Sequence, residues 1–460
     1  MIPLQAYENK TIGVFGLGRS GLAAVRALEV GGANVLAWDD NAGTVEGFEY
    51  PTSDLYQADL SQLSALVVAP GVPLSHPSPH PLVVAAREAR VPVVGDIELF
   101  AAARAGLGAH RVAAITGTNG KSTTTALLGH VLEAASVPVA VGGNIGIPVF
   151  DLEPLGEGGV YVLELSSFQL DLTHTLKADL AILLNITPDH LDRHGTMESY
   201  VRSKLRLFEM QTPDQVAVIS VDDPESRKIA SKLKQTVIPV SVEAPQKGGV
   251  YVQDGRLFDS LKGPAKEVGS LLNCRSLHGR HNWQNAAAVY AAGRLLGVSG
   301  ELILDALHSF PGLNHRLQCV SSAAGVLFVN DSKASNVDAA LKALQSFEDI
   351  YWIAGGRLKA ESLSPLDEGL GRVRKAYLIG EAADIFELHL KDRLPTEILG
   401  EVQAAVEAAA RDAAAAGSGV VLLAPACASF DQFRNFEERG DAFTAAVGRT
   451  VAKLNERGGI

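Results

Sequence analysis

VAAITGTNGKST, residues 112–123, is the stretch that decides the fold of this chain. Its apolar first half is typical of a buried β-strand, and a helical pattern follows over residues 125–135. A strand, a glycine-rich turn and a helix in this order direct backbone N–H groups and a helix N-terminus toward one point, where a polyphosphate binds. We expect Lys121 to reach the β- and γ-phosphates, and Ser122 or Thr123 to offer a hydroxyl to Mg²⁺. The stretch therefore predicts a site for a nucleoside triphosphate.

This loop departs from the common phosphate-binding pattern G-x-x-x-x-G-K-[ST] at one position, because Ile115 stands where the first glycine belongs. A Gly-Lys pair before a hydroxyl also occurs in ordinary strand-to-helix turns, which is the alternative interpretation. The flanking strand and helix favour the nucleotide site. The residues assigned to ATP in the loop are Gly117, Thr118, Asn119, Gly120, Lys121, Ser122 and Thr123.

The length and composition of the chain limit the classes of protein to which it can belong. A chain of 460 residues predicts about three domains, and 47% hydrophobic with 20% charged residues suits ordinary globular cores. The first ten residues have no apolar signal core, and no run reaches the ~18 apolar residues of a membrane span. Three separated cysteines indicate neither a disulfide framework nor a zinc site, and a net charge of −12 argues against nucleic-acid binding. We expect a soluble, cytoplasmic monomer without membrane or nucleic-acid partners.

The first hundred residues have the pattern of a separate Rossmann-like domain. An apolar run at 10–15 precedes GLGRSG at 16–21, a helical stretch runs to about residue 29, and a second strand at 34–38 ends in Asp39-Asp40. This order matches the dinucleotide fingerprint G-x-G-x-x-G with an acid placed for a ribose, and by itself it indicates an NAD-dependent dehydrogenase. Alternatively, the glycines serve only tight packing of strand and helix. We predict a nucleotide or diphosphate site here and leave its identity open; further strands are expected at 65–69 and 91–94.

Two polar segments follow predicted strands of the central region. The strand at 159–164 ends in Glu164, a position that suits an acid beside Mg²⁺. The strand at 180–184 leads into NITPDHLDRH, whose two histidines and two aspartates within six residues also allow a transition-metal site. Next to a phosphate-binding loop, His190 better suits a magnesium–phosphate centre. Lys204 lies on an amphipathic helix predicted over residues 197–210, and nothing local distinguishes it.

A third region begins after Pro311-Gly312, which is typical of a linker. Its predicted strands alternate with helical stretches, so we expect another doubly wound sheet. The loops after these strands are rich in Lys, Ser and Asn, which are groups that hold a carboxylate. The four strands are expected at 325–329, 349–354, 375–379 and 419–423. The predicted fold class is α/β with three domains: Rossmann-like (1–101), P-loop ATPase-like (102–311) and a second Rossmann-like doubly wound sheet (312–460).

Three α/β units of a kind that binds nucleotides, predicted in one chain, restrict the classes of function that fit the whole chain. A P-loop switch protein or motor explains the middle domain alone, and a dehydrogenase has no use for Lys121 and Glu164. A ligase that joins a nucleotide-linked acid to an amine at the expense of ATP explains all three units. We therefore predict a ligase.

The motifs resemble the Mur ligases of bacterial peptidoglycan synthesis over essentially the whole chain. GTNGKST is similar to that family's form of the phosphate-binding loop, which accounts for the absent first glycine. The resemblance implies ATP and Mg²⁺, with two metal sites, as cofactors, and a carbamylated lysine at position 204. It implies that the metal-site residues are Ser122, Glu164, His190 and Lys204, and that the catalytic residues are Lys121, Glu164, His190 and Lys204. It also implies that Asn282 and Asn285 lie near the adenosine, that Arg316 and Asp331 are further ATP contacts, and that Asn144 lies near the substrate.

Within the family, three C-terminal motifs resemble the members that add D-glutamate: NDSKASN, GGRLKAESLSPL and PACASFDQFRNFEERG. The resemblance implies UDP-N-acetylmuramoyl-L-alanine and D-glutamate as substrates, joined through an acyl phosphate. Asp40, Asn41 and Ala69 depart from the family's pattern, so it does not say how the uracil is held. The implied substrate contacts are Ser335 and Lys359 for the α-carboxylate, Ser429 and Phe436 for the side-chain carboxylate, Arg19 and Ser20 for the diphosphate, and Ser166 and Lys333 in addition.

Two rival hypotheses keep the P-loop. A folate-type polyglutamate ligase shares this loop, but that family lacks a domain of about a hundred residues ahead of it. A non-catalytic nucleotide-binding regulator has no reason to retain Glu164, His190 and Lys204 together. Phosphate release with an amino acid separates an enzyme from the regulator.

Overall fold

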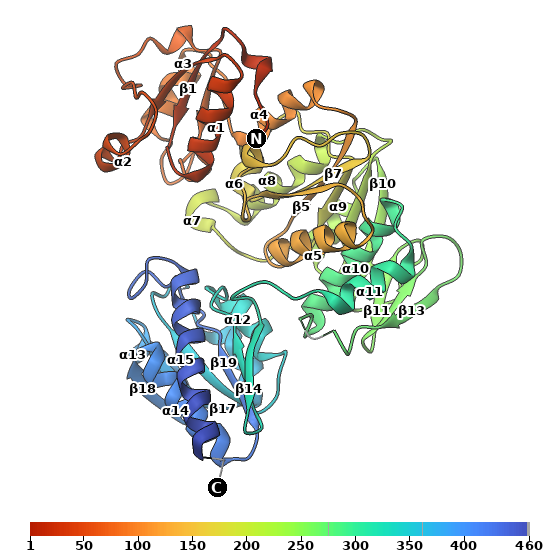
Figure 1. Ribbon diagram of the computed structural model, residues 1–460, viewed down its shortest axis with the longest axis vertical. Helices are drawn as coiled ribbons and strands as arrows, with labels where there is room; N and C mark the ends of the chain where they lie inside the picture. The colour runs from red at the N-terminus through yellow and green to blue at the C-terminus, as the bar shows by residue number, and fades with distance from the viewer. Residues whose placement is uncertain (275, 361, 458–460) are drawn as a thin grey trace. The chain divides into compact units, whose positions relative to one another are not determined.

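The computed structural model describes residues 1–274, 276–360 and 362–457 (Figure 1). The chain forms three sheets flanked by helices, in agreement with the predicted α/β class. Its residues group into two compact units. The first contains residues 1–270 and 284–307, and the second contains residues 271–283 and the described residues from 308 onward. No helix of the described part is long and apolar enough to cross a membrane.

The N-terminal sheet of the first unit is parallel and has the strand order β2-β1-β3-β4. Its strands are short and mostly buried, as expected for a sheet covered by helices. The predicted strand at 91–94 is reduced to Val93–Val94, and the other three agree with prediction to within one residue. The elements are β1 (Thr11–Phe15), α1 (Arg19–Val30), β2 (Asn34–Trp38), α2 (Ala42–Glu46), β3 (Ala65–Val68), α3 (Pro81–Glu88), β4 (Val93–Val94) and α4 (Asp96–Ala103).

The central sheet has nine strands in the order β13-β12-β11-β10-β9-β8-β5-β7-β6. The strand before the phosphate-binding loop, β5 (His110–Thr116), lies between β7 (Gly159–Glu164) and β8 (Leu180–Leu183) and is parallel to both. The chain therefore crosses from one side of β5 to the other, and the loops after these three strands meet at one edge of the sheet. Ligands of doubly wound sheets bind at such a reversal of strand order.

The remaining elements of this region complete the sheet and its helical cover. Three of its strands form an antiparallel extension that the sequence analysis did not predict. Asp254 and Gly255 form the turn of its first hairpin with positive φ angles of 50° and 73°, the conformation that an Asp-Gly pair favours. The elements are α5 (Lys121–Ala134), β6 (Val139–Gly143), α6 (Ser167–Asp171), α7 (Leu191–His194), α8 (Met197–Glu209), β9 (Val216–Ser220), α9 (Pro224–Ala230), β10 (Thr236–Ser241), β11 (Val250–Gln253), β12 (Arg256–Asp259), β13 (Lys266–Ser270), α10 (Arg280–Leu295) and α11 (Gly300–Ser309).

The second unit contains a six-stranded sheet in the order β14-β15-β19-β16-β17-β18. Only β14 is antiparallel to its neighbour, and it was not predicted. Apolar side chains pack on both faces: Trp352 and Phe386 belong to one core, Tyr377 and Phe443 to the other. The elements are β14 (Gln318–Ala323), β15 (Val326–Asn330), α12 (Val337–Leu344), β16 (Ile350–Gly355), β17 (Val373–Ile379), α13 (Ala383–Leu390), β18 (Thr396–Gly400), α14 (Val402–Ala415), β19 (Gly419–Leu423) and α15 (Phe436–Arg457).

Candidate active site

The phosphate-binding loop is a tight turn between β5 and α5 that requires its glycines. Gly117 and Gly120 have φ angles of 150° and 86°, which side chains rarely adopt. A Cβ at Gly120 would lie 2.4 Å from the Asn285 amide oxygen of α10. Asn185, which follows β8, accepts a hydrogen bond from the Asn119 N–H (2.9 Å) and donates one to the Asn119 carbonyl (3.1 Å). These contacts with neighbouring segments therefore fix the conformation of the loop.

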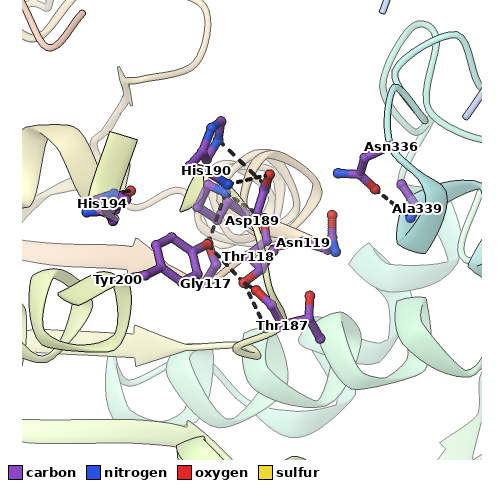
Figure 2. A network of polar contacts seen from close by, with 12 residues as sticks. Gly117, Thr118, Asn119, Thr187, Asp189, His190, His194, Tyr200, Asn336 and Ala339 are labelled. Carbon is purple, nitrogen blue, oxygen red and sulfur yellow. Dashed lines mark hydrogen bonds and ion pairs between the residues drawn. The ribbon is translucent and has the colours of Figure 1, made fainter. Parts of the chain in front are cut away.

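A polar network joins this loop to two other segments (Figure 2). The Thr118 hydroxyl lies 3.0 Å from the Tyr200 hydroxyl of α8, accepts from the Thr187 N–H at 3.0 Å and contacts the Thr187 carbonyl at 3.1 Å. Thr187 belongs to the loop after β8. The structure thus connects the three segments that the sequence analysis singled out separately.

Two lysines converge on one backbone carbonyl. Lys121 donates to the carbonyls of Gly117 (3.0 Å) and Thr118 (2.8 Å), and Lys204 donates to that of Gly117 at 2.7 Å. The Lys204 side chain is buried and its ammonium lies 4.7 Å from the centre of the Tyr200 ring. Burial, and next the charge of Lys121, hold the pKa of Lys204 well below its ordinary value. A lysine with a lowered pKa is a nucleophile, which its helical sequence context did not reveal.

Glu164 is a buried carboxylate with one oxygen unsatisfied. Its Oε1 accepts a 2.7 Å hydrogen bond from the Asn144 amide, while Oε2 is buried and has no hydrogen-bond partner among the described residues. A buried carboxylate oxygen without a partner is costly, and a cation relieves that cost. The donor set of Glu164 and the Ser122 hydroxyl at the start of α5 therefore fits Mg²⁺, which prefers oxygen ligands and phosphate.

His190 follows β8 in a left-handed backbone conformation with a φ of 54°. Its Nε2 lies 3.6 Å from a carboxylate oxygen of Asp189, and its ring meets the Phe168 ring edge-on at 5.0 Å. Burial lowers the pKa of His190, partly opposed by Asp189. Among the described residues no three His, Cys, Asp or Glu side chains gather to hold a metal ion. The alternative of a transition-metal site in PDHLDRH therefore finds no support.

A cavity of about 280 Å³ in the first unit lies beside Glu164's partner Asn144. Arg19 and Ser20 of the N-terminal glycine-rich loop line it, together with Asp96 and Gln169. The structure therefore brings together predicted diphosphate and substrate residues. Ser166, also predicted to contact substrate, caps α6 by accepting from the Gln169 N–H at 3.2 Å.

Asp96 and Gln169 were missed by the sequence analysis. The Gln169 amide donates to both carboxylate oxygens of Asp96, at 3.2 and 3.4 Å, and burial raises the pKa of Asp96. The two residues lie 73 positions apart. Gln169 forms a capping box with Ser166, a local pattern that does not indicate its pairing with Asp96.

Helix α10 carries both predicted adenosine-side asparagines three residues apart, which places them on one side of the helix. Asn285 lies against Gly120, as described above, and the Asn282 amide donates to the His278 carbonyl at 2.9 Å.

The second unit gathers the other predicted residues on loops after three adjacent strands, β15, β19 and β16. Asp331 is buried, accepts from the Leu317 N–H at 3.2 Å, and has a pKa raised to about 7 by burial. The Lys333 ammonium lies 3.9 Å from the centre of the Phe436 ring. Asn336, after Ser335, caps α12 by accepting from the Ala339 N–H at 2.8 Å (Figure 2). The remaining predicted residues on these loops are the buried Ser429 and the exposed Lys359, whereas Arg316 precedes β14.

Arg439, at the start of α15, is a third residue that the sequence analysis missed. Its guanidinium is buried and donates to the hydroxyl (3.0 Å) and carbonyl (2.8 Å) of Ser332 and to the Cys427 carbonyl (3.1 Å). Burial lowers its pKa to about 10. Arg439 therefore joins the loops after β15 and β19. Its only sequence signal is an arginine within FEERG, which is equally typical of an exposed helix.

Comparison with protein families matches two segments of the chain. Residues 115–293 match the Mur ligase middle domain, and residues 315–427 match the Mur ligase, glutamate ligase domain.

Among curated proteins, the UDP-N-acetylmuramoylalanine–D-glutamate ligase of Phenylobacterium zucineum is 51% identical, over 97% of this chain and 98% of that protein. The protein of that name in Nitrobacter hamburgensis is also 51% identical, with the same coverage. Among solved structures, the UDP-N-acetylmuramate–alanine ligase of Thermotoga maritima aligns with a TM-score of 0.60 and 17% identity, over 96% of this chain and all of that one. At that identity the likeness concerns the fold.

Proposed function

The chain belongs to the Mur ligase family, and on that premise we propose that it is the ATP-dependent ligase that adds D-glutamate to UDP-N-acetylmuramoyl-L-alanine in peptidoglycan precursor synthesis. The observation that carries the proposal is the convergence of Lys121, Lys204 and the unsatisfied carboxylate of Glu164 at the edge of the central sheet. These groups suit transfer of a phosphoryl group, whose transition state is stabilised by positioned cations.

ATP binds, in this proposal, with its phosphates on the loop at residues 117–123. Asn282 and Asn285 take the adenosine, and Arg316 and Asp331 supply contacts from the second unit. Ser122, Glu164 and His190 would hold magnesium, which would neutralise phosphate charge when bound. These roles follow the family resemblance and are supported by the tight glycine loop and the orphaned Glu164 oxygen.

Lys204 is proposed to be carbamylated. Its neutral amine attacks the carbon of CO₂, the N–C bond forms as one C–O π bond breaks, and one proton is released, so that a neutral buried amine becomes an anionic carbamate. Burial and Lys121 lower the pKa of Lys204 and so favour the neutral amine that this step requires. The carbamate would add oxygen ligands near Glu164.

The reaction proceeds in two steps. A carboxylate oxygen of the L-alanine moiety attacks the γ-phosphorus, the bond to the β,γ-bridging oxygen breaks, and ADP leaves. Lys121 stabilises the negative charge on the phosphoryl oxygens. The D-glutamate amine then attacks the acyl carbon, loses a proton, and inorganic phosphate departs. Holding both reactants together contributes roughly 7–11 kcal/mol to such a reaction.

The amino-acid side of the site lies on the strand-end loops of the second unit. Ser335 and Lys359 are proposed to bind the α-carboxylate, and Ser429 and Phe436 the side-chain carboxylate. Ser429 is buried, and Arg439 hydrogen-bonds to both the loop after β15 and the loop after β19; both observations support a preformed site. Arg19 and Ser20 are proposed for the diphosphate, with Asn144, Ser166 and Lys333 as further substrate contacts. The three-domain division at 101 and 311, a monomeric state and a cytoplasmic location belong to the same proposal.

Phosphate release from Mg-ATP tests the function directly. With UDP-N-acetylmuramoyl-L-alanine present, we expect turnover with D-glutamate and none with L-glutamate, L-lysine or diaminopimelate. Turnover with another amino acid would keep the ligase chemistry and overturn the assignment of the second unit. No release with any of the four would favour a nucleotide-binding regulator.

Replacing Lys359 tests the placement of D-glutamate. We expect Lys359→Ala to raise the KM for D-glutamate by about 10-fold or more, because a charge-assisted hydrogen bond to a carboxylate is lost. The KM for the UDP-linked substrate should stay within about twofold, measured by the same phosphate assay. Lys391→Ala, at another exposed lysine of the second unit, is the control. An unchanged KM for D-glutamate in Lys359→Ala would refute the placement.

A further inference from the structure

His194 is the centre of a buried polar network that the proposed chemistry does not use (His194 is labelled in Figure 2). It is the last residue of α7, and its side chain is 4% exposed. Its Nε2 lies 3.0 Å from the Ser167 hydroxyl of α6. Its Nδ1 lies 3.3 Å from the Ser203 hydroxyl of α8 and 3.6 Å from the Asp171 carboxylate of α6. One imidazole therefore contacts polar groups of two neighbouring helices.

The hydrogen bonds define which ring nitrogen carries the proton. Ser203 donates to Asp171 at 2.6 Å, so its oxygen is left to accept from His194 Nδ1–H. Nε2 is then the acceptor for the Ser167 hydroxyl. Burial, together with the nearby cationic groups, lowers the pKa of His194 to about 4. The neutral ring satisfies the Ser167 and Ser203 hydroxyls at once.

Aromatic packing supports the same placement. The Phe168 ring stacks on the His194 ring at 5.3 Å with an interplanar angle of 9°, and it also contacts the edge of His190 and the Arg193 guanidinium. The Tyr200 ring of α8 lies 5.3 Å from His194. The imidazole is thus fixed by stacking as well as by hydrogen bonds.

The network is adjacent in sequence to Glu164, His190 and Lys204, three of the four residues proposed for the metal site. Glu164 precedes Ser167 by three residues, His190 precedes His194 by one helical turn, and Lys204 directly follows Ser203. Within the described part of the chain, none of these three residues hydrogen-bonds to another of them; Glu164 accepts from the Asn144 amide and Lys204 donates to the Gly117 carbonyl. Glu164 ends β7, His190 precedes α7 and Lys204 lies on α8, so their mutual placement depends on how α7 and α8 are held against α6, the helix that follows β7.

We propose that His194 is a positioning residue that joins α6, α7 and α8 and thereby sets the placement of Glu164, His190 and Lys204. The proposal rests on the proposed function. His194 contacts no substrate in it and transfers no proton. It acts by holding the residues that do, and supporting residues of this kind typically change metal affinity or activity by about 10–100-fold when replaced.

The test compares two replacements of His194 in the full-length protein. His194→Phe keeps an aromatic ring for stacking on Phe168 but loses both hydrogen bonds. His194→Gln retains an acceptor for Ser167 and a donor for Ser203. We expect kcat to fall about 10–100-fold in His194→Phe with the KM for D-glutamate within about twofold, and to recover to within about threefold of wild type in His194→Gln. Glu198→Gln, on the exposed side of α8, is the control.

A second measurement does not depend on turnover. Free Mn²⁺ followed by electron paramagnetic resonance reports the affinity of the enzyme–ATP complex for the metal, and we expect His194→Phe to weaken it about 10-fold or more. If His194→Phe does not fold, Ser203→Ala, which removes one partner, is measured in the same way. Normal kcat and normal Mn²⁺ affinity in folded His194→Phe would overturn the proposal. Equal losses of kcat in His194→Phe and His194→Gln would overturn it too.

The two proposals fail in different ways. If wild-type protein shows no phosphate release with D-glutamate, the proposed function fails while Mn²⁺ binding still tests His194. If wild-type protein is active and His194→Phe behaves like Glu198→Gln in both measurements, only the positioning role fails.

Discussion

Lys121→Ala is expected to abolish ATP turnover, with phosphate release falling by at least about 10²–10³-fold. Lys121 begins α5 and already points its ammonium at the carbonyls of the phosphate-binding loop, where the transferred phosphate is proposed to lie. Once Lys204 is carbamylated, Lys121 is the one lysine that the proposed mechanism places at the phosphate-binding loop. The measurement is phosphate release from Mg-ATP with both substrates at saturation.

A surface lysine provides the control for this prediction. Lys228→Ala removes an exposed side chain whose ion pair is with Glu225, three residues away on α9, so we expect no change in turnover. Near-normal turnover in Lys121→Ala would contradict the assignment of the phosphate-binding loop.

Lys204→Met is expected to lower kcat by about 100-fold or more, because it replaces the amine with an apolar group of similar length and leaves no site for a carbamate. The side chain is buried, so methionine preserves its volume while the hydrogen bond to the Gly117 carbonyl is lost. Lys121 still donates to that carbonyl, which limits the cost to folding. Steady-state kinetics, with the thermal unfolding midpoint as a check on folding, measure the effect.

Labelled bicarbonate separates a modified lysine from a merely buried one. Protein equilibrated with ¹³C-bicarbonate should give a carbamate carbonyl resonance in wild type that Lys204→Met lacks. Lys232→Met, at an exposed lysine of the same unit, should retain both the resonance and the activity. Full activity of Lys204→Met would remove Lys204 from the mechanism.

Much of the fold was predictable because its parallel strands are apolar runs bounded by glycine and polar loops. The strands at 34–38 and 419–423 agree residue for residue, and most others shift by one or two. The antiparallel additions were not predicted, and neither were the parallel strands β6, β9, β10 and β18. Asp254-Gly255 is a recognisable turn signal, but β13 is largely exposed and polar, so alternation there is weak. Strand β14 is partly exposed too, and its pairing is set by its neighbour β15.

A residue of the candidate site could be predicted when the residues that explain its role lie close to it in the sequence. Lys121 is recognisable because the glycines and hydroxyls that explain it are its neighbours in sequence. Lys204 was assigned only through the family resemblance, since its partner Gly117 is 87 residues away. Asp96 and Arg439 carry no local signal of their roles, and the histidine-rich segment that contains His194 indicated a metal site rather than its role, because each acts through partners brought to it by folding.

The sequence by itself determined the order of the α/β units, the phosphate-binding loop and the family, since each is encoded in contiguous residues whose spacing matches the geometry of a strand, turn or helix. Only the tertiary structure decided what surrounds each polar group. It buried Lys204 beside Lys121, left one oxygen of Glu164 without a partner, and enclosed His194 between two helices. The physical reason is that desolvation and hydrogen bonding of a polar group depend on the residues that surround it in space. The order of the strands in each sheet brings those residues together, and the pattern of residues along the sequence does not show which ones they are.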